Sequence, residues 1–460
     1  MRTAVLLLAL LLMPSVHARE PATPGDTGVL GVREDQLDAG YWIRRLRAGD
    51  RVILDASAIA AQNQRLVAQD LSMHDLAALP STLAGAQVKA WIEKLRPAFD
   101  RPLYDEQGQP LAMPALAARI GRALDVEAIP AKVSARFGLV VRRADLRAVP
   151  DTQRVFRSAD DHDIDRWQES ALFASTPVAI VHESADRKWW FVVSPDYAAW
   201  VQKAFVAEGP RETVLGYGRG QPALVALGAN VRTTFTPEAP QVSSLLLDMG
   251  VAVPRVDPGG REPVNGQDAY ASYVVQLPAR AGDGTLQLLP ALVPRSADVG
   301  THYLPLSQAN LLRQAFKFLG ERYGWGNSYG TRDCSSFVSE VYRSTGVDLP
   351  RNTSDQAISP VFNRIGLGKA DDRSKRLALL KAAQPGDLVY IPGHVMMVIG
   401  HEGGHTWVIH DTSGASWQDA SGQRVRARLN GVSVTPLEPM LYGDTDTYVD
   451  HITSIVRIRP

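Results

Sequence analysis

The sequence predicts a multidomain α+β protein with a helical N-terminal region, two small β domains and a C-terminal α+β domain. Its 460 residues are about three times the ~150 typical of one domain. Helical periodicity runs from Glu34 to about Leu124, short β-branched runs follow, and helices and then strands return after Ser307. A hydrophobic content of 45% and a charged content of 21% are typical of a folded globular chain.

The charge and cysteine counts exclude several classes of function. The 49 basic residues balance 49 acidic ones, whereas a nucleic-acid-binding protein normally presents a basic face. We therefore expect no nucleic acid partner. The chain has a single cysteine, which rules out an intramolecular disulfide framework and a cysteine-rich metal site.

The first 18 residues have the pattern of an export signal. Met1 and Arg2 give a basic start, an apolar run occupies positions 4–13, Pro14 ends it, and Val-His-Ala at 16–18 is an acceptable cleavage site. The alternative is a first helix of the mature fold. Because this run is shorter than the ~20 residues that cross a bilayer, and no later run is longer, we expect no membrane span. The sequence predicts cleavage after Ala18 and a periplasmic or secreted protein.

The middle of the chain predicts two consecutive β domains. Prolines cut the helical region 19–125 into short pieces, and runs such as Pro177–His182 and Lys188–Val193 then indicate a small antiparallel barrel or sandwich over 130–207. After a Gly/Pro-rich connector, a second β-rich stretch occupies 228–300. Four tryptophans of the first β domain could form a substrate wall or a core, and we expect the core: Trp167, Trp189, Trp190 and Trp200.

The C-terminal domain, residues 305–460, is predicted to start with helices and continue as an antiparallel sheet. One helix begins after Ser307 and stops near Gly320, and a second follows Cys334 and stops near Gly346. Strand-like runs occupy 387–391, 394–399, 406–410 and 452–458. Cys334 thus stands where a loop enters a helix. The free N–H groups and dipole of a helix start lower a thiol pKa and favour the nucleophilic thiolate. The alternative is an inert, buried structural cysteine.

Two histidines follow the cysteine on neighbouring predicted strands. His394 opens one strand and His410 closes the next, and the glycine-containing segment between the strands predicts a β-hairpin. If residues 400 and 406 pair, residue 396 faces residue 410, and both histidines lie on one face as diagonal neighbours. Such a pair can act as a base and the group that orients it. The segment His401–His405 also matches H-E-x-x-H, but its central Gly-Gly and β-branched flanks favour a hairpin over a zinc-binding helix.

An ordered set of motifs in residues 307–460 resembles the NlpC-type papain-like cysteine peptidases. It comprises Tyr-Gly-Trp-Gly at 323–326, Asp-Cys-Ser at 333–335, Leu-Pro-Arg-Asn-Thr-Ser-Asp-Gln at 349–356, Gln-Pro-Gly-Asp-Leu-Val at 384–389 and Gly-His-Val at 393–395. Residues 137–147 and 163–170 resemble the first bacterial SH3-type domain of a multidomain branch of these enzymes. The 231–300 stretch fits a second SH3-type domain, and the helical start fits an N-terminal clip domain.

The resemblance implies a peptidoglycan hydrolase that cuts stem peptides, usually between γ-D-glutamate and diaminopimelate or lysine, with no cofactor. It makes Cys334 the nucleophile, His394 the general base and acid, and His410 the orienting group. Three further positions match motif residues that line the substrate groove: Tyr323, Asp333 and Ser335. Two positions depart from many relatives, since Ser336 and Asn327 each replace a glycine.

Other functions remain open at this point. A non-catalytic wall-binding protein could use the peptidase domain as a scaffold, although a scaffold does not need all three of Cys334, His394 and His410. A recycling enzyme for free stem peptides with an N-terminal L-Ala would use the same residues, and so would an acyl transferase. The sequence leaves regulation and oligomeric state open.

Overall fold

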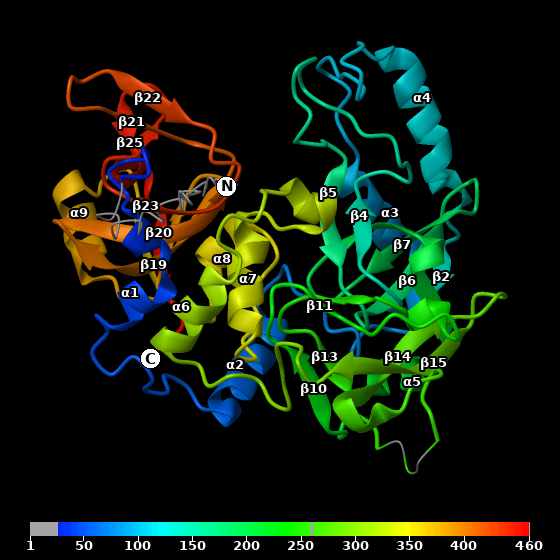
Figure 1. Ribbon diagram of the computed structural model, residues 1–460. Helices are drawn as coiled ribbons and strands as arrows, with labels where there is room; N and C mark the ends of the chain where they lie inside the picture. Colours follow the sequence, from blue (N-terminus) through cyan, green and yellow to red (C-terminus); the bar gives the residue numbers. More distant parts are fainter. Residues whose placement is uncertain (1–25, 258, 260–261, 460) are drawn as a thin grey trace, which may run out of the picture.

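The computed structural model describes residues 26–257, 259 and 262–459 (Figure 1). The predicted export signal lies outside these residues. The C-terminal domain occupies one side of the molecule, and the two β domains occupy the other. In the part of the chain that is described, no helix combines the length and apolar character needed to cross a membrane.

The N-terminal helices divide between two hydrophobic cores. They are η1 (Glu34–Leu37), α1 (Ala39–Ile43), α2 (Ala56–Gln69), α3 (Gly85–Leu95) and α4 (Met113–Leu124), with η2 (Val126–Ala128) after them. Side chains of α1 and α2 share the core of the C-terminal domain, where the Trp42 and Trp407 rings lie 5.5 Å apart. Side chains of α3 and α4 pack into the core of the first β domain. Figure 1 shows this division, with blue α1 and α2 beside the C-terminal domain.

The first β domain is a seven-stranded antiparallel sheet in the order β5-β4-β8-β7-β6-β3-β9. Its strands are β3 (Arg136–Val140), β4 (Ala144–Arg147), β5 (Gln168–Leu172), β6 (Pro177–Glu183), β7 (Trp189–Val193), β8 (Ala198–Gln202) and β9 (Val206–Gly209). A short ladder joins β1 (Thr82–Ala84) to β2 (Lys132–Ser134). All four tryptophans of this domain are at least 95% buried, which confirms that they form the core.

The second β domain consists of smaller antiparallel sheets around its own apolar core. The sheets are β13-β10-β16, β11-β12 and the long hairpin β14-β15. The strands are β10 (Ala223–Ala226), β11 (Val231–Arg232), β12 (Leu246–Leu247), β13 (Ala252–Pro254), β14 (Ser272–Arg280), β15 (Leu286–Pro294) and β16 (Val299–Gly300). The short helices of this domain are η4 (Pro240–Val242) and η5 (Ala269–Ala271), whereas η3 (Lys203–Phe205) lies between β8 and β9 and α5 (Arg211–Gly216) packs on the first β domain.

The C-terminal domain packs helices against a six-stranded antiparallel sheet in the order β17-β26-β18-β19-β20-β23. The strands of this sheet are β17 (Asn363–Gly366), β18 (Leu388–Ile391), β19 (His394–Glu402), β20 (His405–Thr412), β23 (Gly431–Pro436) and β26 (Ser454–Arg457). The helices are α6 (Gln308–Phe316), η6 (Trp325–Gly330), α7 (Cys334–Arg343), α8 (Thr353–Ile358), α9 (Arg373–Ala382) and η7 (Tyr448–His451). Two small ladders pair β21 (Ala415–Gln418) with β22 (Arg424–Ala427) and β24 (Leu441–Tyr442) with β25 (Asp446–Thr447). The predicted α+β class is confirmed.

Local signals explain where the two helices that frame the site begin. Ser307 caps α6 by accepting a hydrogen bond from the Asn310 N–H, as its position predicts. Asp333 caps α7 in the same way by accepting from the Ser336 N–H at 3.0 Å. Helix α7 is buried along nearly its whole length, so packing on every side fixes the direction in which its first residue points. The domain boundaries themselves stay predictions.

Candidate active site

The lone cysteine is the first residue of α7 and is buried, with 5% of its surface exposed. Its Sγ lies 3.7 Å from the Thr353 Oγ1, and the backbone N–H of Val395 hydrogen-bonds to the sulfur. Val395 directly follows His394 on β19. The start of α7 and the start of β19 therefore meet at Cys334.

The thiol is less acidic than the sequence predicts. Burial, reinforced by the negative charge of Asp333, raises the pKa of Cys334 to about 12. The hydrogen bonds from Thr353 and Val395 act in the opposite direction but are weaker. The expectation of a lowered thiol pKa is therefore wrong, because the desolvation of a thiolate outweighs the favourable field of the helix start.

The two histidines meet across the hairpin of β19 and β20. The His394 Nε2 lies 2.8 Å from the His410 Nδ1, and the His410 Nε2 lies 3.0 Å from the Thr435 Oγ1 of β23. Burial lowers the pKa of His394 to about 4 and that of His410 well below its usual value. Both imidazoles are consequently neutral at pH 7. The prediction that the two histidines share a face is confirmed.

The hairpin reaches this alignment by a different register from the predicted one. Gly400 pairs with Trp407, whereas Met397 pairs with Ile409, because a β-bulge lies between Val398 and Gly400. Between the bulge and the two histidines the predicted pairing holds, and between the bulge and the turn the pairing is shifted by one residue. The turn consists of Gly403 and Gly404, with φ of +61° and +84°, as a tight two-residue hairpin turn requires.

The H-E-x-x-H segment is therefore strand and turn, and its side chains face separate partners. The His401 Nε2 contacts the Ala383 carbonyl oxygen at 2.8 Å, and the His405 Nδ1 lies 3.5 Å from a Glu438 carboxylate oxygen. The Glu402 carboxylate accepts hydrogen bonds from two side chains of the N-terminal region. Within residues 26–257, 259 and 262–459, no group of three or more His, Cys, Asp or Glu side chains is arranged to hold a metal ion.

Of the three predicted groove residues, Asp333 and Ser335 are joined in one buried network. The Ser335 Oγ donates to the Asp333 Oδ1 at 3.1 Å, and both side chains accept hydrogen bonds from Arg351. Tyr323 is buried too, and its backbone N–H donates to the Asn430 carbonyl oxygen at 3.0 Å. Burial, together with the negative charge of a Cys334 thiolate, raises the pKa of the Tyr323 phenol.

Arg351 is the residue that the sequence reasoning missed. Its Nη2 lies 2.7 Å from the Asp333 Oδ2, and its Nε donates to the Ser170 Oγ of the first β domain at 2.6 Å. Beside Ser170, the Glu169 carboxylate accepts a hydrogen bond from the Tyr197 hydroxyl, and burial raises the pKa of Glu169. Arg351 lies in the quoted Leu-Pro-Arg-Asn motif, which was the available signal. Its partner in β5, Ser170, is 181 positions away in the sequence.

The two positions that depart from many relatives have structural explanations. Asn327 has φ of +63°, in the left-handed region where Asn is the best-tolerated residue after Gly. Ser336 is buried in the first turn of α7 and donates its backbone N–H to the cap residue Asp333. Neither residue displaces Cys334.

Comparison with known proteins agrees with this geometry. Residues 320–434 match the NlpC/P60 family, and residues 154–202 match an SH3 domain of the SH3b1 type. Over 97 residues the chain is 34% identical to "Probable endopeptidase p60" of Listeria welshimeri and 33% identical to its namesake in Listeria seeligeri. Each alignment covers 20% of this chain and only 16% of the relative.

A solved structure shares the fold over most of the chain. The NlpC/P60 endopeptidase from Photobacterium damselae subsp. piscicida superposes with a TM-score of 0.69, covering 86% of this chain and 90% of that one at 18% identity. The resemblances of the second β domain to an SH3-type domain and of the helical start to a clip domain stay predictions. The C-terminal domain of this chain is thus similar to the NlpC/P60 family over residues 320–434, and a match to an SH3 domain precedes it in the same chain.

Proposed function

We propose that the protein is an exported peptidoglycan hydrolase that cuts the stem peptide between γ-D-glutamate and diaminopimelate. Cys334 is the nucleophile, His394 the general base and acid, and His410 the group that orients His394. The observation that carries the proposal is the 2.8 Å contact between the His394 Nε2 and the His410 Nδ1, beside a cysteine at a helix start. A nucleophile, a base and an orienting group are the three parts that nucleophilic catalysis needs.

A chain of donors supports these roles. The Thr435 hydroxyl donates to the Met440 Sδ at 3.4 Å, which leaves its oxygen to accept the Nε2–H of His410. His410 then accepts, through Nδ1, the Nε2–H of His394. The Nδ1 of His394 is left without a proton, so it is the nitrogen that can take the proton of the Cys334 thiol.

The reaction starts from a neutral thiol and a neutral imidazole, because burial raises the pKa of Cys334 and lowers that of His394. His394 removes the thiol proton as the sulfur attacks the γ-amide carbonyl, and backbone N–H groups at the start of α7 stabilise the oxyanion. His394 then gives this proton to the leaving amine, which departs from the thioester. Water, deprotonated by His394, hydrolyses the thioester and restores the thiol. No cofactor takes part in these steps.

Incubation with purified sacculi tests the proposal. Wild-type protein should release new amino termini of diaminopimelate, detected by mass spectrometry, and Cys334→Ala should release none. Cys334→Ala should still fold, because the substitution removes only the sulfur atom and leaves the packing around it in place. Release by Cys334→Ala at the wild-type rate would exclude Cys334 as the nucleophile. Retention of the wild-type protein on sacculi without new termini would favour the wall-binding alternative, and an acylated product would favour acyl transfer.

A second candidate, the hydrolysis of free stem peptides with an N-terminal L-Ala, is favoured by one observation. The first β domain brings Glu169 and Tyr197 next to Arg351, which in turn contacts Asp333 beside the nucleophile. A half-buried carboxylate at that position suits a peptide's free amino group. Cleavage of L-Ala-γ-D-Glu-diaminopimelate but not of its N-acetylated form would select this candidate. Equal cleavage of both forms would select the intact wall.

A further inference from the structure

The turn that leads into Cys334 has an irregular backbone. In η6 (Trp325–Gly330), three of the four residues 326–329 have left-handed backbone conformations, with φ of +56° at Gly326, +63° at Asn327 and +62° at Tyr329. Non-glycine residues hold such angles at a cost of about 1 kcal/mol or more and need support from their surroundings. Part of the support for this turn comes from its own domain, where the Asp333 Oδ2 accepts from the Gly326 N–H at 3.1 Å, and part comes from the two β domains.

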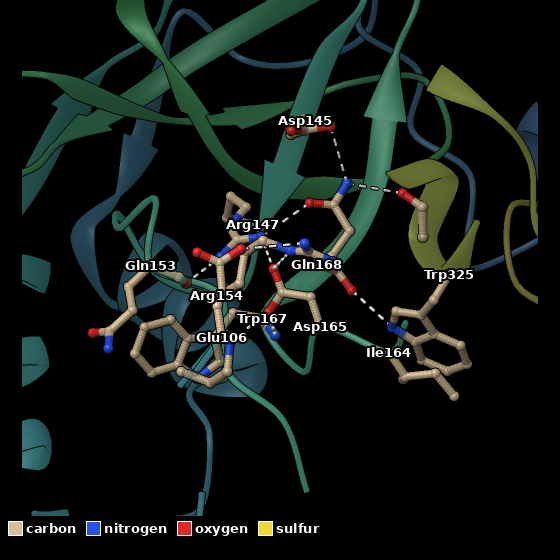
Figure 2. Close-up of polar contacts among 12 residues, drawn as sticks. Glu106, Asp145, Arg147, Gln153, Arg154, Ile164, Asp165, Trp167, Gln168 and Trp325 are labelled. Carbon is tan, nitrogen blue, oxygen red and sulfur yellow. Dashed lines mark hydrogen bonds and ion pairs between the residues drawn. The ribbon is translucent and has the colours of Figure 1, made fainter. Parts of the chain in front are cut away.

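The first β domain holds the front of this turn. The Trp325 Nε1 donates to the Gln168 carbonyl oxygen at 3.1 Å, and the Gln168 Nε2 donates to the Gly326 carbonyl oxygen at 2.9 Å (Figure 2). A Cβ on Gly326 would lie 2.8 Å from the Gln168 Cγ, so only glycine fits there. Gln168 is fixed in turn by Arg147, whose guanidinium pairs with the buried Asp165.

The end of the turn is held by Arg332, two residues before the cysteine and completely buried. Its Nη1 donates to both Glu321 carboxylate oxygens at 2.8 and 2.7 Å, and its Nε lies 3.1 Å from the Glu340 Oε2 of α7. Its Nη2 reaches the second β domain, at the Ala229 carbonyl oxygen (3.0 Å) and the Asp248 Oδ1 (3.4 Å). Arg332 therefore links the nucleophile's helix to the second β domain.

Asp248 also receives an arginine from the first β domain. The Arg143 Nη1 donates to the same Asp248 Oδ1, and its Nη2 donates to the carbonyl oxygens of Thr331 and, at 3.2 Å, Asn327. Asp248 is completely buried and Arg143 nearly so. One carboxylate thus joins two arginines: Arg332, which stands two residues before Cys334, and Arg143, which contacts Asn327 and Thr331.

We propose that Asp248 is a positioning residue for the nucleophile: through Arg332 and Arg143 it fixes residues 327–332 and thereby the place of Cys334 relative to His394. The kinetic part of this inference rests on the proposed function. Asp248 lies in the second β domain and has no contact with Cys334, so it acts through the two arginines. Because a displacement of 1 Å can lower a rate about a hundredfold, a loosened helix start slows the chemical step more than it weakens substrate binding.

The variant Asp248→Asn keeps the shape of the side chain and removes the charge that holds both arginines. We expect kcat for stem-peptide cleavage to fall about ten- to a hundredfold, with KM changed less than about twofold. The rate at which iodoacetamide alkylates Cys334 should change as well, because a displaced thiol loses its contacts with Thr353 and the Val395 N–H. Asp298→Asn is the matched control, since Asp298 forms an exposed 2.6 Å ion pair with Lys317 between the same two domains. This control should leave kcat and the alkylation rate unchanged.

A second variant covers the case in which Asp248→Asn does not fold. Arg143→Lys keeps the positive charge beside Asp248 but cannot reach the Thr331 and Asn327 carbonyls together, so kcat should fall while circular dichroism stays native. The inference is overturned if folded Asp248→Asn, or folded Arg143→Lys in its place, matches Asp298→Asn in both kcat and alkylation rate. If the wild-type protein cleaves no stem peptide, the proposed function fails, and the alkylation rates alone then decide whether Asp248 positions Cys334.

Discussion

Acidification from pH 7 to pH 4 should destabilise the protein through His394. The imidazole is half-buried at the start of β19, and its partial desolvation lowers its pKa from 6.5 to about 4. The unfolded chain therefore binds the proton more tightly than the folded chain does. The stabilisation is fully present above pH 6.5 and is lost as the pH falls from 6.5 to 4. The difference between these two pKa values corresponds to about 3 kcal/mol.

Urea unfolding at several pH values measures this loss. His394→Gln cannot titrate, so its free energy of unfolding should fall by about 3 kcal/mol less than that of the wild-type protein over the same range. Equal losses in the two proteins would refute the assignment of a lowered pKa to His394. Kinetics give a second measurement, because kcat/KM reports the base in the free enzyme. Its acid limb should lie near pH 4, and a limb near pH 6.5 would contradict the lowered pKa of His394.

Three substitutions test other contacts of the C-terminal domain. Thr435→Val leaves the His410 Nε2 without its acceptor, and should lower both kcat and the free energy of unfolding, the latter by about 1–3 kcal/mol in urea titrations. An unchanged kcat would separate Thr435 from the orientation of His410. Trp42→Ala should cost about 3–5 kcal/mol in urea unfolding, because this 1% exposed side chain fills the core beside β20; a loss below about 1 kcal/mol would contradict that packing. Tyr448→Ala should lower kcat for stem-peptide cleavage, because the Tyr448 ring contacts the His394 ring edge-on at 6.4 Å, and Tyr448→Phe should retain wild-type kcat.

The part of the site that depends on local pattern was readable from the sequence. His394 and His410 stand on apolar strands joined by a glycine-containing turn, which together predict a hairpin and align residue 396 with residue 410. The extra residue of the bulge was not readable, because β19 is buried on both faces from Val395 to Ile399 and has no hydrophobic alternation that would mark it. The predicted helix starts at Ser307 and Cys334 carry their own capping residues, and both are present.

The pKa of Cys334 and the contacts between distant residues could not be predicted from local sequence pattern. The pKa of Cys334 was expected to fall because its helix position is visible in the sequence, whereas the protein that surrounds the sulfur is not. The contacts of Arg332 with Asp248 and of Arg351 with Ser170 join residues 84 and 181 positions apart. No periodicity or motif spacing specifies such pairs, since the packing of whole domains brings them together.

The division of the N-terminal helices between two cores has a consequence for how the chain folds during synthesis. The Gln36 Nε2 donates to the Glu402 carboxylate across 366 positions, and Trp42 packs against Trp407. Gln36 and Trp42 can therefore form these contacts only after residues 402–407 have been synthesised. Domains fold in order as a chain emerges, so α3, α4 and the first β domain can be complete while α1 still lacks its partner. The C-terminal core closes only around a segment that was synthesised first, and its assembly is the late step of folding.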